Sequence, residues 1–296
     1  MEEHKSAFIA IVGSPNVGKS TLMNYIVGAK VAIVSGKPQT TRNKIVGVVT
    51  GRDFQMVFLD TPGIHSAKNK LGEYMVKTAF DSTRDVEAVL FVCDGKYGLG
   101  ERDKEIVRQL VKGGLPILGA VNKTDAIRKE QSVAVAEDLH AAGLETGVFQ
   151  ISAKTGEGVD ELMAALKTHL VPGPKYYPDD EYTDQPERAI AGEMIREKAL
   201  ELLREEVPHG VGVQIEKVSE REDKDIIDVA ATIICERNSH KGIIIGKGGK
   251  MLKRIGTDAR GDLEMLFGTK VFLELWVKVE ENWRDSRRVM KELGYE

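Results

Sequence analysis

Residues 13–20 place the strongest constraint on the fold of this chain, because they match the pattern of a phosphate-binding loop. The letters GSPNVGKS fit G-x-x-x-x-G-K-[ST], an apolar run at residues 8–12 predicts a strand before them, and residues 21–27 predict a helix after them. Two glycines let backbone N–H groups turn inward around a phosphate, and the helix N-terminus adds a partial positive charge. The alternative is a glycine turn that only joins a strand to a helix. The pattern predicts a nucleotide triphosphate site and leaves the base open.

The end of this loop carries the groups that the chemistry of a triphosphate needs. We expect the Lys19 ammonium to reach the outer phosphates as a point charge, and the Ser20 hydroxyl to complete the shell of a Mg²⁺ ion. Every position of the loop is expected to contact the nucleotide. The predicted contacts are Gly13, Ser14, Pro15, Asn16, Val17, Gly18, Lys19, Ser20 and Thr21.

Composition indicates a globular chain of two domains. At 296 residues the chain is long for one core, and 42% apolar with 30% charged residues is ordinary. The net charge of −4 and the isoelectric point near 6.0 give no global sign of nucleic-acid binding, so such binding requires a local basic patch. Cys93 and Cys235 lie in apolar runs, which indicates buried thiols in a reducing cytosol. No apolar run approaches the about 18 residues of a membrane span, so we expect a cytoplasmic protein.

A threonine-containing segment follows the phosphate loop. Residues 37–42 (KPQTTR) place Thr40 and Thr41 ahead of a strand predicted at residues 44–50. A connector of this kind after a phosphate loop is where a nucleotide switch segment would fall. A threonine-rich loop without that role is the alternative.

A second candidate segment, DTPG, follows a strand predicted at residues 55–59. An aspartate such as Asp60, at the carboxyl end of a strand beside the phosphate loop, can hold Mg²⁺ through water, and the Gly63 amide can point at a terminal phosphate. In isolation the four letters are a common turn. The further predicted nucleotide contacts are Thr40, Thr41, Asp60, Thr61, Pro62, Gly63 and Ile64, and the predicted Mg²⁺ ligands are Ser20, Thr41 and Asp60.

The base is predicted to be guanine. A buried strand at residues 116–121 ends in the letters NKTD, and a strand at residues 148–151 ends in SAK. The Asp125 carboxylate can accept two hydrogen bonds from guanine that adenine does not offer, and a buried carboxylate without them would cost several kcal/mol. Either motif alone might be only a strand-end turn. The predicted base contacts are Asn122, Lys123, Asp125, Ser152, Ala153 and Lys154.

Strands alternating with helices over residues 6–170 predict a doubly wound α/β domain with a mostly parallel sheet, and we assign residues 1–171 to it. All the motif loops fall at the carboxyl edges of its strands. The letters VPGP and YYPDD are rich in helix breakers and predict a linker at residues 172–187.

An α+β domain is predicted over residues 188–296. An amphipathic helix at residues 187–205 opens it, with strands at 211–218 and 225–236, a charged turn at 219–224, a last strand at 271–279 and a short helix at 283–293. Trp276 and Trp283 could stack on bases, although tryptophans in such elements more often belong to the core.

A loop rich in glycine and lysine predicts that this domain binds nucleic acid. The letters GKGG at residues 246–249 fit the G-x-x-G loop of a KH module and precede a helix predicted at residues 251–267. Glycines let the backbone approach a single strand, basic side chains attract its phosphates, and isoleucines supply an apolar floor for bases. A glycine-rich helix start with a solvated lysine face is the alternative. The predicted RNA contacts are Ile243, Ile244, Gly246, Lys247, Gly248, Gly249, Lys250, Lys253 and Arg254.

The order of the motifs in the first domain resembles the translation-factor class of GTPases. The whole chain is similar to one family, the Era GTPases of bacteria, in GSPNVGKSTLMN, KPQTTR, DTPGIH, NKTD, SAK, GKGGKMLKRIG and LELWVKV. The resemblance implies a Mg²⁺-dependent GTPase, which converts GTP to GDP and phosphate, followed by a type II KH domain. It implies a factor for 30S ribosomal subunit assembly that grips the single-stranded 3′ end of 16S ribosomal RNA with GTP bound and releases it after hydrolysis. It also implies a monomer and a fraction loosely attached to the inner face of the cell membrane.

Hydrolysis is expected to be slow without a partner. Many small GTPases place a glutamine after the Asp-x-x-Gly loop to orient the attacking water, whereas this chain has Ile64. Backbone groups and Mg²⁺ must then suffice, with K⁺ as a second cation: in related GTPases an asparagine at the position of Asn16 helps to bind potassium. A plain polar loop residue is the alternative. The predicted catalytic residues are Asn16, Lys19, Thr41 and Gly63.

Two other functions remain open. One is a passive RNA-binding assembly protein in which the nucleotide only stabilises the fold. The other is an ATP-dependent enzyme, against which Asn122 and Asp125 argue. RNA affinity measured with a GTP analogue and with GDP separates a switch from a passive binder.

Overall fold

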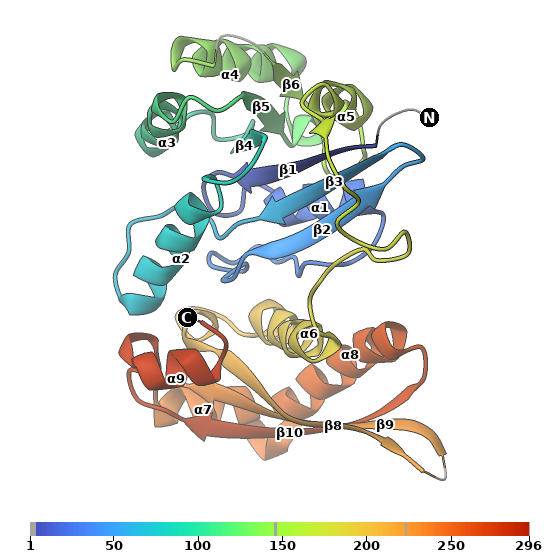
Figure 1. Ribbon diagram of the computed structural model, residues 1–296. Coiled ribbons are helices and arrows are strands. Elements are labelled where there is room, and N and C mark those ends of the chain that lie inside the picture. The colour runs from blue at the N-terminus through green and yellow to red at the C-terminus, as the bar shows by residue number, and fades with distance from the viewer. Residues whose placement is uncertain (1–3, 145–146, 223, 296) are drawn as a thin grey trace. The chain divides into compact units, whose positions relative to one another are not determined.

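The computed structural model describes residues 4–144, 147–222 and 224–295, and these form two compact units (Figure 1). The first unit consists of the chain up to Ala32, Thr41–Ser66 and Met75–Asp184. The second consists of Ile33–Thr40, Ala67–Tyr74 and the chain from Gln185 onward. Each unit is therefore assembled from segments that are distant in the sequence. We call Ile33–Thr40, which belongs to the second unit, the threonine segment.

The first unit is built on a mostly parallel sheet with the strand order β2-β3-β1-β4-β5-β6. The strands β3, β1, β4, β5 and β6 are parallel to one another, the edge strand β2 is antiparallel to β3, and the short β7 is antiparallel to β1. β4 is buried at every residue, as a strand with both faces covered requires. The strands are β1 Lys5–Val12, β2 Ile45–Thr50, β3 Phe54–Asp60, β4 Ala88–Asp94, β5 Ile117–Asn122, β6 Val148–Gln150 and β7 Val171–Pro172.

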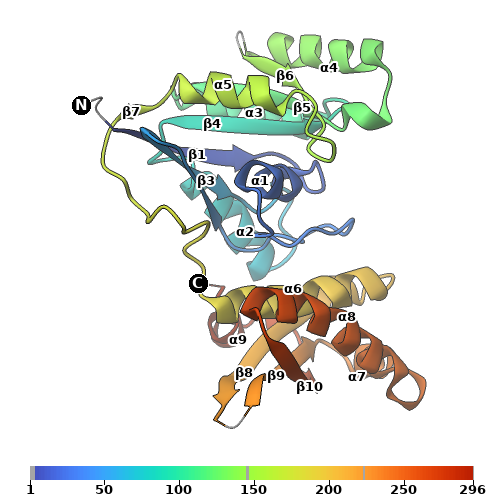
Figure 2. The same cartoon turned by 90° about the vertical axis from the view of Figure 1, so that its right-hand side faces the viewer.

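Helices cover both faces of this sheet (Figure 2). α1 and α5 pack on one face, where Leu22 and Leu162 enter the core, and α2, α3 and α4 supply Ala79, Val107 and Leu139 to the core on the other face. The predicted doubly wound domain is confirmed, and its parallel strands bring the motif loops to one edge of the sheet. The helices are α1 Lys19–Val27, α2 Lys70–Asp81, α3 Glu101–Lys112, α4 Lys129–Ala141 and α5 Val159–Lys167.

The helix-breaking stretch after β7 follows the surface of the first unit. The side chain of Gln55, fully buried in β3, accepts hydrogen bonds from the N–H groups of Tyr176 at 2.8 Å and Tyr177 at 3.0 Å, and it donates to the Tyr177 carbonyl at 2.9 Å. The N–H of Val48 in the edge strand β2 donates to the carbonyl of Tyr182 at 2.9 Å. The backbone of this stretch is thus held by the Gln55 side chain near one end and by the edge strand β2 near the other.

The second unit is an α+β domain with the strand order β10-β9-β8 (Figure 1). β8 and β9 are antiparallel, whereas β9 and β10 are parallel and are connected through α7 and α8. α6 and α8 pack on each other and on the sheet, and Ile195, Ile233 and Ile255 are fully buried between them. The arrangement agrees with the predicted KH domain. The elements are α6 Glu187–Leu202, β8 Gly212–Arg221, β9 Lys224–Cys235, α7 Asn238–Ile245, α8 Lys250–Phe267, β10 Lys270–Val279 and α9 Arg287–Glu292.

Several smaller expectations are decided by burial. Cys93 and Cys235 are buried free thiols, as predicted. Trp283 belongs to the core, where its indole N–H donates to the Gly210 carbonyl at 2.8 Å, but Trp276 on β10 is 49% exposed, so the core interpretation is wrong for that residue. Within the described ranges, no helix combines the length and the apolar character needed to cross a membrane. In the predicted turn at residues 219–224, position 223 lies outside the described residues.

Candidate functional site

The phosphate loop between β1 and α1 has a backbone that depends on its glycines. Gly13 has φ 151°, and a Cβ there would lie 2.2 Å from the carbonyl oxygen of Val92 in β4. Gly18 has φ 100°, and a Cβ there would lie 2.2 Å from the side-chain nitrogen of Asn122. Asn16 has φ 62°, a conformation that asparagine adopts more readily than most residues. The loop therefore closes tightly against the ends of β4 and β5.

Lys19, the first residue of α1, turns its side chain back into the loop. Its Nζ donates to the carbonyl oxygens of Gly13 at 3.2 Å and Ser14 at 3.1 Å. Burial lowers the pKa of Lys19 to about 8, although the carboxylates of Asp60 and Asp103 act in the opposite direction. A buried ammonium is costly unless negative charge faces it, so this position suits an anionic ligand.

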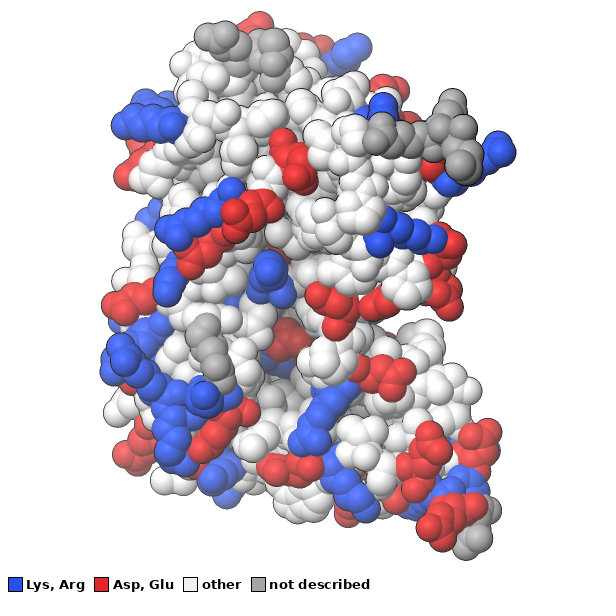
Figure 3. Space-filling view, in the orientation of Figure 1, with Lys and Arg blue, Asp and Glu red and all other residues white. Residues whose placement is uncertain are grey.

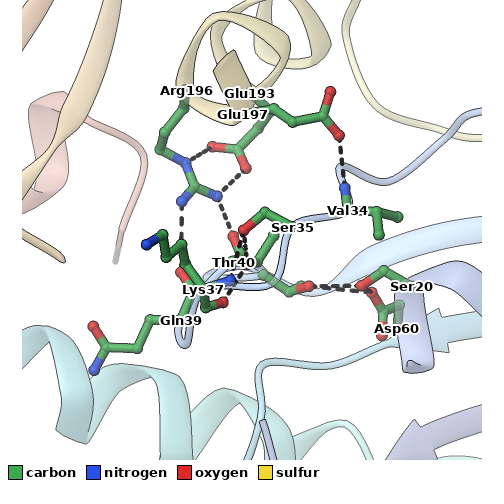
Figure 4. A network of polar contacts seen from close by, with 11 residues as sticks. Ser20, Val34, Ser35, Lys37, Gln39, Thr40, Asp60, Glu193, Arg196 and Glu197 are labelled. Carbon is green, nitrogen blue, oxygen red and sulfur yellow. Dashed lines mark hydrogen bonds and ion pairs between the residues drawn. The ribbon is translucent and has the colours of Figure 1, made fainter. Parts of the chain in front are cut away.

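The three predicted Mg²⁺ ligands meet beside the start of α1. Figure 4 shows two of them, Ser20 and Asp60, next to each other. Ser20 Oγ donates to Asp60 Oδ2 at 2.6 Å and lies 2.8 Å from Thr41 Oγ1, which is 3.4 Å from the same Asp60 oxygen. Asp60 is fully buried, and its Oδ1 has no hydrogen-bond partner in the described part of the chain. Burial raises the pKa of Asp60 to about 6, against the effects of Lys19 and of its hydrogen bonds. A buried carboxylate with an open oxygen, flanked by two hydroxyls, is a donor set that fits Mg²⁺.

The segment after β3 packs directly on the phosphate loop. Gly63 is so close to it that a Cβ there would lie 2.6 Å from the Cα of Pro15. The N–H of Ile64 donates to the carbonyl of Gly13 at 3.1 Å, and the Ile64 side chain is buried in the core. Ile64 thus presents its backbone to the phosphate loop and keeps its side chain out of the site.

Asn122 joins the predicted base-binding loops to the phosphate loop. Its Nδ2 donates to the Val17 carbonyl at 2.8 Å, and its Oδ1 accepts from the N–H of Ala153 at 2.9 Å. Asp125 Oδ1 accepts from the Ser152 hydroxyl at 2.7 Å. Asp125 is exposed, contrary to the buried carboxylate assumed from the sequence, because it lies one turn beyond the end of β5. An unpaired Asp125 carboxylate therefore costs free energy only if the bound base itself shields it from water.

Two aspartates outside the predicted set brace these loops. Asp94, the last residue of β4, accepts from Lys123 Nζ at 2.6 Å, and the same Nζ donates to the Asn16 carbonyl at 2.7 Å. Asp103, in the first turn of α3, accepts from the Ser14 hydroxyl at 2.5 Å. Asp94 has a sequence signal, an acidic residue at the end of a buried strand. Nothing in the sequence around Asp103 distinguishes it from other acidic residues near a helix start.

Other predicted contacts direct their side chains elsewhere. The Thr61 hydroxyl donates to the Ile11 carbonyl at 2.8 Å. The Thr40 hydroxyl donates to the Lys37 carbonyl at 2.6 Å and so stays within the threonine segment. Val17 and Pro62 are buried, Pro15 and Thr21 are partly buried, and Lys154 is exposed. Of the two adjacent threonines, only Thr41 joins the predicted metal ligands.

The G-x-x-G loop of the second unit lies between α7 and α8, as predicted. Gly246 has φ 71° and ψ 170°, a combination largely confined to glycine, and a Cβ there would lie 2.7 Å from the Cβ of Met251. Gly248 has φ 61° and Gly249 has φ 77°, and no atom of the described residues lies within 4 Å of a Cβ built on either. The loop therefore packs closely on α8 at Gly246 and is open at its tip.

The basic residues around this loop face solvent, whereas only one of the two predicted isoleucines does. The exposed cations are Lys247, Lys250, Lys253 and Arg254. Ile243 is 49% exposed, but Ile244 is fully buried in the core of the second unit. The predicted base contact of Ile244 is therefore wrong, because this face of α7 packs inward.

A groove of about 410 Å³ lies beside the loop, between α8 and the edge strand β10. Its lining includes Lys253, Thr257 and Arg260 from α8 and Phe272 from β10, whose ring is 48% exposed. Cations beside an exposed aromatic ring are the combination by which single-stranded nucleic acids are held. Figure 3 shows basic and acidic side chains interspersed over one face of the molecule, in keeping with the small net charge. Phe272 was not predicted, because the sequence does not show which side of β10 faces outward. Arg260 was not predicted, because it lies on α8 beyond the basic residues that surround the G-x-x-G loop.

Family models match both parts of the chain. Residues 8–123 match a model described as a 50S ribosome-binding GTPase, and residues 206–284 match a KH domain model. Among curated relatives, the GTPase Era of Alkaliphilus metalliredigens is 51% identical over 293 residues, which is 99% of each chain. The GTPase Era of Clostridioides difficile is 50% identical over 292 residues, 98% of each chain.

Solved structures agree over the same length. Era from Aquifex aeolicus bound to GDP·AlF4⁻ has a TM-score of 0.95 and 39% identity, with 98% of this chain and 99% of that one covered. A structure of Era with MgGDPNP and nucleotides 1506-1542 of 16S ribosomal RNA has a TM-score of 0.95 and 39% identity, with 99% of both covered. Since half of the residues are shared with curated relatives along nearly the entire chain, this protein belongs to the Era family of GTPases.

Proposed function

We propose that this GTPase is a switch that grips the single-stranded 3′ end of small-subunit ribosomal RNA through its KH domain and acts in assembly of the 30S subunit. The observation that carries the proposal is the meeting of Ser20, Thr41 and Asp60 at one point, since it places a donor set that fits Mg²⁺ beside the phosphate loop. Support for the RNA comes from the relative solved with 16S ribosomal RNA nucleotides and from the basic and aromatic lining of the α8–β10 groove.

The nucleotide is assigned to the loops at the carboxyl edge of the first sheet. Backbone N–H groups of the phosphate loop and the Lys19 ammonium hold its phosphates. Asp125 accepts hydrogen bonds from guanine, held in position by the Ser152 hydroxyl at 2.7 Å. Asn122 keeps the phosphate and base loops in register through its bonds to Val17 and Ala153.

Hydrolysis is assigned to the same edge. Mg²⁺, for which Ser20, Thr41 and Asp60 are the proposed ligands, supplies charge neutralisation on the phosphates when bound. With the Ile64 side chain in the core, orientation of the attacking water falls to backbone groups near Thr41 and Gly63. Because few fixed groups orient that water, we expect GTP hydrolysis to be slow in the free protein.

A potassium ion near Asn16 is a further part of the proposal. Asn16 is exposed at the rim of the phosphate loop with φ 62°, so its side chain is accessible there, while its carbonyl accepts from Lys123. Hydrolysis should be faster in potassium than in sodium buffer. Equal rates would remove the assigned role.

Domain limits and location are also proposals. We keep residues 1–171 as the GTPase domain, 172–187 as the linker and 188–296 as the KH domain, and the start of α6 at Glu187 supports the last boundary. We place the protein in the cytoplasm, where ribosomal subunits are assembled, with a peripheral fraction on the inner face of the membrane. The competing function, a passive RNA binder whose nucleotide only stabilises the fold, predicts the same RNA affinity in every nucleotide state.

The KH loop is tested by charge reversal. Lys247→Asp together with Lys250→Asp replaces two exposed cations by anions, so affinity for a labelled 3′ end of 16S ribosomal RNA should fall at least about tenfold while GTP hydrolysis is retained. The matched control is Lys112→Asp with Lys129→Asp, which makes the same charge change at exposed positions on α3 and α4. Unchanged RNA affinity in the loop variant, or an equal loss in the control, would show that the KH loop is not the RNA site.

A further inference from the structure

Two charged side chains are buried on α6, the first helix of the second unit. Arg196 is 0% exposed and Glu197 is 2% exposed. Buried charges are costly unless they are fully paired and hydrogen-bonded, so their partners indicate what they stabilise. Neither residue belongs to the phosphate loop, the base-binding loops or the G-x-x-G loop.

Both side chains hold the backbone of the threonine segment, which lies in the same compact unit (Figure 4). The Arg196 guanidinium donates to the carbonyl oxygen of Thr40 and, at 3.5 Å, to that of Gln39. Glu197 Oε1 accepts from the N–H of Val34 at 2.8 Å. The threonine segment is thus held by hydrogen bonds near both of its ends. Because the contacts are to backbone atoms, the grip fixes the path of the chain.

The contact with Thr40 has a direct consequence for the metal site. The Thr40 carbonyl and the Thr41 N–H belong to one planar peptide group, and the described residues contain no cis peptide bond. In a trans peptide the N–H points opposite to the carbonyl, so holding the Thr40 oxygen sets the direction in which the chain enters Thr41. Thr41 then brings its hydroxyl to 2.8 Å from Ser20 Oγ.

The same charged cluster continues to the helix that begins at the G-x-x-G loop. Arg196 pairs with Glu193, and Glu197 Oε2 pairs with Lys198 at 3.3 Å. Lys198 in turn pairs with Asp262 of α8 at 3.0 Å. Burial alone would lower the pKa of Lys198, but the hydrogen bond to Asp262 and the nearby Glu197 raise it above its usual value, so the lysine stays charged. Charged contacts therefore run without a gap from the threonine segment through α6 to α8.

We propose that Arg196 and Glu197 are positioning residues for GTP hydrolysis, because they hold the threonine segment in the path that delivers Thr41 to the metal site. The link from Lys198 to Asp262 makes that hold sensitive to what α8 binds. The first statement concerns the hydrolysis reaction alone. The second rests on the proposed function, since it requires RNA at the KH domain.

Removal of the guanidinium tests the first statement. Arg196→Met keeps the apolar stem and deletes the donors, so kcat should fall about ten- to a hundredfold, as expected for a displaced reacting group, while the Kd for GDP stays within about twofold. The Mg²⁺ concentration for half-maximal rate should rise, which a merely structural loss in the folded fraction would not cause. Wild-type kcat and Mg²⁺ dependence would overturn the proposal.

A matched control lies on the same helix. Arg188 also donates to backbone carbonyls, those of Ile215 and Glu216, but it does not contact the threonine segment in these hydrogen bonds. Arg188→Met should leave kcat within about twofold of wild type, and an equal fall there would overturn the assignment to Arg196. If Arg196→Met does not fold, Arg196→Lys takes its place: an ammonium lacks the fork that serves both carbonyls and Glu193, so kcat must still fall at least about threefold.

Asp262→Asn isolates the second statement. It removes the charge that pairs with Lys198 on α8 and leaves Glu197 and its hydrogen bond to Val34 in place, so kcat in the absence of RNA should stay within about twofold of wild type. The difference in RNA affinity between the GTP-analogue and GDP states should shrink at least about threefold, and an unchanged difference would overturn the link through α8. If the wild type itself shows no such difference, the proposed switch function fails, while the effect of Arg196 on kcat still decides the positioning role.

Discussion

Asp60 and Lys19 are buried ionisable residues whose charged forms a bound ligand of opposite charge would stabilise. Burial lowers the pKa of Lys19 to about 8 and raises the pKa of Asp60 to about 6. Burial therefore disfavours the charged form of each side chain, and the attraction between the two charges offsets only part of this effect. Negative phosphate beside Lys19 and a cation beside Asp60 would each stabilise the charged form of the side chain. The two groups proposed to bind the nucleotide and its metal therefore lower the stability of the ligand-free protein.

The free energy of unfolding should consequently depend on pH through Asp60. Its pKa rises from 3.8 to about 6 on folding, so between these values the folded state binds more protons than the unfolded state. Stability is unaffected by this group below about pH 4, falls as the pH rises to about 6, and is lower by on the order of 3 kcal/mol at neutral pH. Denaturation of nucleotide-free, Mg²⁺-free protein should show this fall in the wild type and not in Asp60→Asn.

Ligand provides the internal control for that experiment. Excess Mg²⁺ and GDP should abolish the fall, because a cation beside Asp60 favours its ionised form. Parallel pH curves for the wild type and Asp60→Asn without ligand would contradict the burial of this carboxylate.

Asp125 is the residue proposed to select guanine. In Asp125→Asn the side-chain amide offers a donor where guanine presents donors, so affinity for GTP should fall about a hundredfold and affinity for xanthosine triphosphate should exceed it. Competition binding with the two nucleotides measures both. Retained preference for GTP would show that the base does not rest on Asp125.

The positions of the motif loops at strand ends were predictable, because they follow from the local spacing of glycine, lysine, serine and aspartate. Burial was not. Asp125 proved exposed and Ile244 buried, since burial depends on which elements pack above a residue. The contact of Asp103 could not be predicted either, because Asp103 lies on a helix 89 positions further along the chain than Ser14, whose hydroxyl donates to it.

At the scale of elements, the turn from α7 into α8 shows why replacing a glycine affects stability more in the loop than in the preceding helix. Gly246 has φ 71° and a Cβ there would lie 2.7 Å from the Cβ of Met251, whereas in the described part of the chain nothing lies within 4 Å of a Cβ on Gly242 inside α7. Gly246→Ala should therefore lower the free energy of unfolding by about 1–3 kcal/mol. Gly242→Ala, the matched change in the helix, should raise it by about 0.5–1 kcal/mol, as measured by urea denaturation. Equal effects would contradict the loop geometry.

Helices with a thin apolar stripe escaped prediction. α4 buries only Ser132, Val135 and Leu139 among its described residues, and neither α4 nor α2 was assigned from the sequence. α6 was assigned, but as a helix with one buried side. Its charged residues Arg196 and Glu197 are buried as well, because the threonine segment covers them. Charged residues along a helix predict a solvent-exposed face only where no other segment of the protein packs on that face.

For the whole molecule, the main point that the sequence could not supply is that the threonine segment belongs to the second unit. Thr40 and Arg196 are 156 positions apart, and no local pattern marks their contact. The resemblance to a family predicted the two domains. Only the three-dimensional structure shows that two adjacent threonines belong to different compact units, with Thr41 among the proposed metal ligands and Thr40 bound through its carbonyl by Arg196 of α6.

One measurement tests the central claim, that the guanine nucleotide sets the grip on RNA. A fluorescent 3′ end of 16S ribosomal RNA is titrated with the protein saturated in turn with Mg²⁺ and a non-hydrolysable GTP analogue, and with Mg²⁺ and GDP. The account predicts at least about tenfold tighter binding in the analogue state, a coupling of roughly 1.4 kcal/mol. The same affinity in both states would contradict it.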